Sequence, residues 1–155
     1  MIRFISVLSG TALLLMVPFN AEAACTFLQP VGGGEKIVKK KVERPKGLVG
    51  NAVGRTNWNT DFVVDRSYKS LKLFFTADST DSTSYPIEAF LKFSDGSNRR
   101  VADEQLQPPV GTGRMFGPFQ QEPGKSISQV NFRIGANKDP QATGFSYRIS
   151  VQGCH

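Results

Sequence analysis

The segment from Arg55 to Asp61 gathers the side chains best suited to recognising a small polar ligand. It holds the only Trp of the chain, Trp58, with Asn57 and Asn59 on either side. A flat aromatic ring accepts the C–H face of a sugar, and Asn, Asp and Arg side chains hydrogen-bond its hydroxyls. This grouping predicts a glycan-contacting loop. The alternative is that Trp58 closes one end of a hydrophobic core.

Basic residues form two clusters along the chain, which carries 19 Lys and Arg against 13 Asp and Glu, a net charge of +6. The clusters are Lys39, Lys40 and Lys41, and further on Arg99 and Arg100. In an exported protein this excess favours a polysaccharide or an anionic envelope surface as partner, rather than nucleic acid. The alternative is that the charges serve solubility and guard an edge strand against pairing with other chains.

Two phenylalanines, Phe74 and Phe90, fall out of phase with the apolar positions of their predicted strands. If these strands are neighbours, Phe74 and Phe90 would cluster with Lys72 and Glu88 on one face. An outward apolar group marks a binding or partner surface. The alternative is that both faces of these strands are buried.

Catalytic chemistry has little support. The carboxylates closest in sequence are Asp61 with Asp65, and Asp103 with Glu104, which is the minimum that glycoside hydrolysis requires. The single histidine is the last residue, His155, so an imidazole-based triad is not expected. We expect no enzyme, and a small carboxylate-based hydrolase is the least favoured alternative.

Two loops contain residues of the kind that hold ligands. Residues 111–117 are rich in glycine, but no helix pattern follows them to complete a phosphate site. Residues 78–84 offer two carboxylates and several hydroxyls to Ca²⁺, yet lack the EF-hand pattern. We therefore predict no metal and no cofactor, and leave calcium binding by residues 78–84 as an alternative.

The first 23 residues have the pattern of a secretory signal peptide. A positive start at Arg3 precedes an apolar run that Pro18 ends, and Ala21-Glu22-Ala23 forms a small-x-small cleavage site. Cleavage leaves residues 24–155, a single domain, in the periplasm or outside the cell, with no transmembrane segment. The alternatives are an uncleaved anchor and lipidation of Cys25.

Cys25 and Cys154 are the only cysteines. Two thiols in an oxidising compartment usually pair, and here the bond would join the two ends of the mature chain. The alternative is a reactive thiol at Cys154 beside His155, although adjacent residues in a tail lack the third group that orients such a pair.

Apolar and polar residues alternate with a period of two through most of the mature chain, and no helical period appears. Seven or eight short strands separated by loops rich in Gly, Pro and Asn predict an all-β, antiparallel, jelly-roll-like β-sandwich, with a closed barrel as the alternative. Residues 26–34 are expected to be a flexible entry. The layout is similar to small exported β-sandwich modules, among them carbohydrate-binding jelly rolls.

These patterns together favour an exported, non-catalytic module that binds glycan or an anionic component of the cell envelope. The alternative is a structural or protein-interaction domain of the envelope, in which Phe74 and Phe90 would contact another protein.

Overall fold

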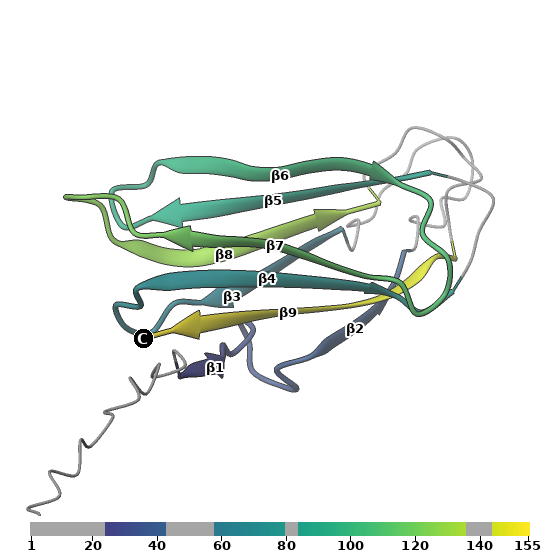
Figure 1. Cartoon of the computed structure of the whole chain (residues 1–155), viewed down its shortest axis with the longest axis horizontal. Coiled ribbons are helices and arrows are strands. Elements are labelled where there is room, and N and C mark those ends of the chain that lie inside the picture. The colour runs from purple at the N-terminus through teal and green to yellow at the C-terminus, as the bar shows by residue number, and fades with distance from the viewer. Residues whose placement is uncertain (1–23, 43–57, 80–83, 136–143) are drawn as a thin grey trace, which may run out of the picture.

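The computed structural model describes residues 24–42, 58–79, 84–135 and 144–155 (Figure 1). Within these ranges the chain forms nine strands and no helix, so the all-β prediction is confirmed. The strands are β1 (Cys25–Phe27), β2 (Val38–Lys41), β3 (Asn59–Val63), β4 (Ser70–Ala77), β5 (Tyr85–Phe93), β6 (Asn98–Leu106), β7 (Gly113–Gln120), β8 (Ile127–Ile134) and β9 (Ser146–Cys154).

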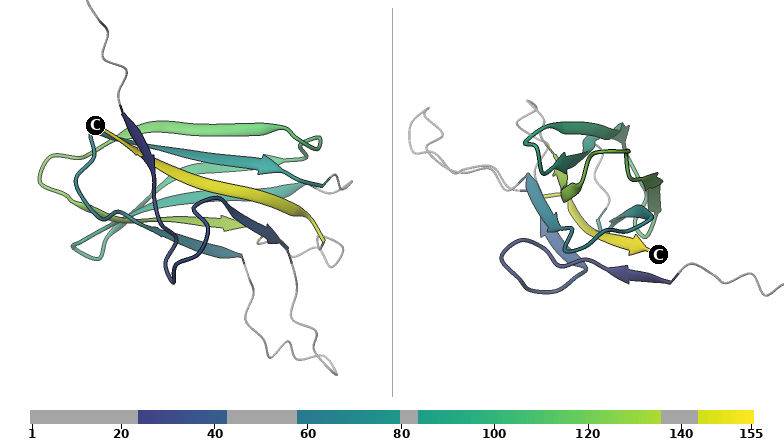
Figure 2. Two further views of the ribbon diagram at one scale, coloured as in Figure 1. Left: turned by 90° about the horizontal axis from the view of Figure 1, so that it is seen from below. Right: turned by 90° about the vertical axis from the view of Figure 1, so that its left-hand side faces the viewer.

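The strands form two antiparallel sheets that face each other (Figure 2). Sheet A has the order β1-β9-β4-β7, with β2 also paired to β9, and sheet B has the order β3-β8-β5-β6. The pairing is nested: β2 with β9, β3 with β8, β4 with β7 and β5 with β6. A ribbon folded double and rolled up in this way is a jelly roll. The jelly-roll prediction is confirmed, and the closed barrel is wrong because the sheets remain separate.

The inner faces of the two sheets make one hydrophobic core. In β4 every second residue is buried, from Leu71 to Ala77, and β5 repeats this from Ile87 to Phe93. At one end, Phe145 stacks on Tyr85 with ring centroids 4.2 Å apart and lies 6.1 Å from Phe75. The period-two alternation seen in the sequence therefore separates core from surface.

The segment after β1 crosses from one sheet to the other. Leu28 donates its amide hydrogen to Val151 of sheet A, and three residues later Val31 donates to Asp61 of sheet B. Val63 of β3 donates to Gln29 in return. Residues 26–34 were expected to be a flexible entry, and this is wrong for residues 26–31: they pair with strands at the edges of both sheets, which would otherwise present unpaired backbone groups.

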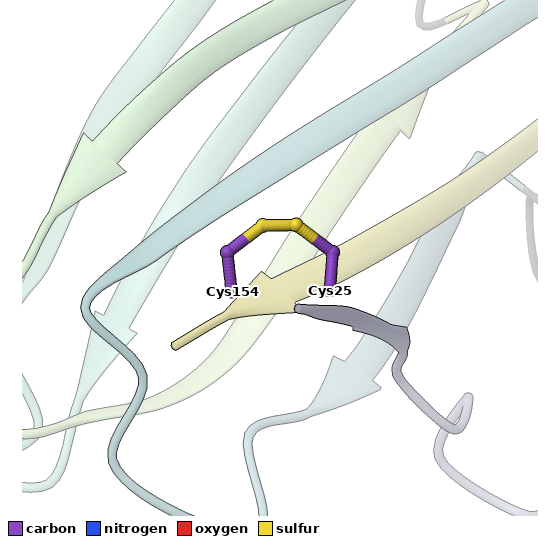
Figure 3. Close-up of a disulfide and its surroundings, with 2 residues drawn as sticks. All are labelled: Cys25 and Cys154. Atoms are coloured by element: carbon purple, nitrogen blue, oxygen red, sulfur yellow. A yellow bond between two sulfur atoms is a disulfide. The ribbon is translucent and has the colours of Figure 1, made fainter. Parts of the chain in front are cut away.

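A disulfide joins Cys25 to Cys154, across 129 residues of chain (Figure 3). The two residues are directly opposite each other in the pairing of β1 with β9. The predicted bond is confirmed. Its formation uses both sulfur atoms, so neither the reactive thiol at Cys154 nor a lipid on the Cys25 sulfur is compatible with this structure.

Some of the expectations concern residues outside the described ranges. The predicted signal peptide, residues 1–23, is one of them, and so are Arg55, Asn57 and most of the 78–84 loop. None of the described residues forms a helix of the length and hydrophobicity that crossing a membrane requires.

Candidate functional site

A groove of about 550 Å³ opens between the edge of sheet A and the edge of sheet B, where β2 comes close to β3. We call it the β2–β3 groove. It is lined by Pro30, Val31, Gly33, Glu35, Ile37, Val38, Lys39, Lys40, Asn59, Thr60 and Asp61. Its size is in the range of small-molecule sites, and it combines an apolar wall with several polar groups.

The apolar wall comes from a loop that is shaped by three successive glycines. Gly32, Gly33 and Gly34 all have positive φ, at 92°, 83° and 103°, which side-chain-bearing residues rarely adopt. The loop carries Val31 and Ile37, both of which are largely exposed. These two side chains give the groove an apolar surface that faces solvent.

Lys40 bridges the two sheets across the groove. Its neighbours Lys39 and Lys41 lie on the outer face of β2, whereas Lys40 lies on the face directed toward the other sheet. Its ammonium group donates to the backbone oxygen of Asn59 and to Oγ1 of Thr60, both at 3.0 Å. Partial burial lowers the pKa of the Lys40 ammonium, because desolvation disfavours the charged form.

Asp61 is held in place at the rim of the groove. Its Oδ1 accepts a hydrogen bond from Lys92 Nζ at 2.7 Å and another from Asn131 Nδ2 at 3.1 Å. Asn131 also reaches Oδ1 of Asn59 at 3.4 Å. In the described part of the chain the second carboxylate oxygen, Oδ2, has no hydrogen-bond partner, so it remains an acceptor for a ligand hydroxyl.

No protein-family model, curated protein or solved structure matches the chain. What the groove can bind therefore follows from its own residues. Donors at Lys39, Lys40 and the Asn59 amide, acceptors at Asp61 and Glu35, and the apolar side chains opposite them suit a ligand with many hydroxyls and apolar C–H faces.

Of the predicted glycan-contacting loop, only part lies at this groove. Asn59 and Asp61 line it, whereas Arg55 and Asn57 are outside the described residues. Trp58 does not line it: the indole packs against the core, and its Nε1 atom is buried without a hydrogen-bond partner in the described residues. The interpretation of Trp58 as a sugar platform stays a prediction, while its partial burial against the core agrees with the alternative of a core-closing Trp.

The two basic clusters lie at opposite sides of the molecule. Lys39 and Lys40 line the groove, whereas Arg99 and Arg100 belong to β6, which is the far edge strand of sheet B. Both arginines are paired with carboxylates, Arg99 with Glu122 and Arg100 with Glu88 and Asp103. The basic residues therefore do not form one patch.

Phe74 and Phe90 also lie apart, on the outer faces of different sheets. The suggestion that they cluster is wrong, because β4 and β5 follow each other in sequence but belong to sheet A and sheet B. Each side chain is half-buried. Phe74 borders a shallow hollow on sheet A, and Phe90 lies next to Asn131 in the pairing of β5 with β8.

The candidate catalytic carboxylates do not converge. Asp65 pairs with Arg66 and Tyr68 near the disulfide, and lines a different hollow from Asp61. Hydrogen bonds from Arg66 and Tyr68 lower the pKa of Asp65, opposite to what a general acid requires. Asp103 pairs with Arg100, and Glu104 with Arg114. Among the described residues no group of three or more His, Cys, Asp and Glu side chains is placed to hold a metal ion.

Several groove residues carried no signal in the sequence. Val31, Ile37, Glu35 and Thr60 have ordinary types and spacing, and Lys40 was noticed only as part of a lysine run. The one available clue was the Gly32-Gly33-Gly34 run, which marks a tight loop directly before the lysines.

Proposed function

We propose that this chain is an exported, non-catalytic binding module that takes a glycan into the β2–β3 groove. The observation that carries the proposal is the pairing, in one groove, of exposed apolar side chains with polar groups fixed by their own contacts. Lys40 and Asp61 are held by Asn59, Thr60, Lys92 and Asn131, so a ligand would meet an ordered set of donors and acceptors.

Export is supported by the disulfide, since such bonds form and persist in oxidising compartments. The predicted signal peptide at residues 1–23 agrees with this. A non-catalytic role is supported by the carboxylates, because Asp61, Asp65, Asp103 and Glu104 each contact a cationic side chain.

The test is affinity electrophoresis of the purified mature protein through gels that contain neutral or uronic-acid polysaccharides. Asn59→Ala removes an exposed amide from the groove, and Lys40→Met removes the ammonium but keeps most of the stem. We expect each to weaken retardation about tenfold, as the loss of one well-placed hydrogen bond to a charged or polar group does.

The matched controls are Asn98→Ala and Lys125→Met, which make the same changes away from the groove. Both should be retarded like the unaltered protein, and all variants should keep its melting temperature within a few degrees. If no polysaccharide retards the protein, or if the groove variants and controls behave alike, the proposal is wrong. Retardation by uronic-acid gels alone would identify an anionic glycan as the ligand.

A further inference from the structure

The outer face of sheet A differs from every other described surface in its charge. The five strands of this sheet contain six basic residues and no Asp or Glu. The basic residues are Lys39, Lys40, Lys41, Lys72, Arg114 and Arg148. The pairing registers place Lys39, Lys72 and Arg148 on the outer face, and only Arg148 has a carboxylate partner, Asp78.

Lys39 and Lys72 carry charge on this face that no carboxylate in the described part of the protein compensates. All six described arginines contact a carboxylate, and so do Lys92 and Lys125. Lys39 and Lys72 have no ion-pair partner among the described residues. The positive field outside sheet A is therefore not cancelled locally, and it extends over about a Debye length into solvent.

Apolar side chains lie among these lysines. A hollow of about 200 Å³ on the face is lined by Phe27, Ile37 and Phe74, together with polar residues of β4 and β9. Phe27 and Ile37 are 38% and 44% exposed. Met115, the cross-strand neighbour of Phe74, is 49% exposed. With apolar side chains among its lysines, this face can attract anionic groups and also bury apolar surface against a partner.

We propose that the outer face of sheet A docks on a lipid surface that carries anionic headgroups. Unpaired lysines are attracted to the headgroups without needing a fixed geometry, and their stems lie along apolar surface while the ammonium groups stay in water. Phe27, Ile37 and Met115 then enter the boundary between headgroups and acyl chains.

A lipid surface accounts for more of this face than an acidic polymer does. A soluble polyanion would be attracted by Lys39 and Lys72, but it has no use for exposed Phe, Ile and Met side chains between them. The proposal can be tested separately from the glycan proposal, because Lys72, Phe27, Phe74 and Met115 of this face do not line the β2–β3 groove, and only Lys39 and Ile37 belong to both.

The test is co-sedimentation of the mature protein with phosphatidylglycerol vesicles and with phosphatidylcholine vesicles, at low and high salt. We expect binding to the anionic vesicles only, weakening as salt rises. Lys72→Glu reverses a charge on the face without touching the groove, and should weaken binding about 20-fold. Met115→Ser keeps the charge and should weaken binding about fivefold through lost apolar contact.

The controls make the same changes elsewhere. Lys125→Glu reverses a charge in the turn between β7 and β8, and Val110→Ser removes an exposed apolar side chain between β6 and β7. Both should bind as the unaltered protein does, within about twofold.

Three results would overturn the proposal. One is equal binding, or no binding, to the two kinds of vesicle. Another is equal weakening by Lys72→Glu and Lys125→Glu, which would mean that net charge alone acts. The third is full binding by Met115→Ser combined with competition by soluble polyphosphate, which would identify an acidic polymer as the partner of this face.

Discussion

Sheet A and sheet B have similar inner faces and very different outer faces. Toward the core both present fully buried apolar and aromatic side chains, such as Phe75 from sheet A and Phe132 from sheet B. The strands of sheet B carry four acidic and four basic residues, Asp61, Glu88, Asp103 and Glu104 with Lys92, Arg99, Arg100 and Arg133. Each of these is ion-paired, whereas the strands of sheet A carry basic residues only.

This difference distinguishes residues that stabilise the fold from residues that are free to contact a partner. The inner faces must pack together, so their composition is dictated by the fold. The charges of sheet B are all ion-paired and leave little to offer a partner, while Lys39 and Lys72 of sheet A have no ion-pair partner among the described residues. An outer face with lysines that have no ion-pair partner among the described residues is therefore the place to look for an interaction that the fold itself does not require.

The largest expected effect concerns the disulfide, which ties sheet A alone. Cys25→Ser combined with Cys154→Ser should lower the free energy of unfolding by about 5 kcal/mol, because the bond closes a loop of 129 residues. Denaturant unfolding measures this loss. Hydrogen exchange should speed up first in β1, which pairs only with β9, and only later in sheet B. Unchanged unfolding of the double variant would contradict the prediction.

A smaller effect should distinguish the two outer faces directly. Glu88 lies between Arg100 and Arg133, 3.3 Å from each, with only 15% of its side chain exposed. Glu88→Gln should therefore destabilise the protein by about 1 kcal/mol, whereas Lys72→Gln on sheet A should change stability by less than about 0.5 kcal/mol. Thermal melts of both variants provide the measurement. Equal losses would mean that the lysines of sheet A also serve the fold.

The smallest expected effect is on the pH dependence of the melting temperature, and it involves two carboxylates with lowered pKa values. Hydrogen bonds from Arg66 lower the pKa of Asp65 near the disulfide, and those from Ser97 lower the pKa of Asp95 in the β5–β6 turn. Their stabilisation is present above the unfolded pKa of about 4, and is lost as pH falls through the lower folded pKa. Asp65→Asn and Asp95→Asn should each make the melting temperature fall slightly less on acidification below about pH 4 than it does in the unaltered protein.

Parallel melting curves for all three proteins across that pH range would contradict the acid prediction. A response from only one of the two variants would show that acid sensitivity is confined to one of these two carboxylates.

The sequence was sufficient to predict the sandwich, its jelly-roll character and the disulfide, because alternation and cysteine position are local or countable signals. It was not sufficient for β1. Thr26 and Phe27 have no alternating pattern around them, and they form a strand only because β9 lies beside them. A strand that forms only through pairing with another strand has no alternating pattern in its own sequence.

The groove could be predicted only in pieces. Lys39 and Lys40 stand out in the sequence for their charge, and Asn59 and Asp61 for their hydrogen-bonding groups. The two pairs are about 20 residues apart, and no local pattern indicates that they lie side by side in the fold. That meeting depends on the nested pairing, which places the edge of sheet A beside the edge of sheet B. The same pairing explains the error with Phe74 and Phe90, whose strands are neighbours in sequence but lie in different sheets.

The position of β9 governs the order in which the molecule can be assembled. This strand pairs with β1, β2 and β4, yet it follows every other described strand in the sequence. Sheet A therefore has no centre until β9 has been synthesised, whereas every pair in sheet B is available once β8 has emerged. Until then the lysine-rich strand β2 has no strand to pair with. Repulsion between its lysines and those of other copies opposes association of incompletely folded chains through this strand.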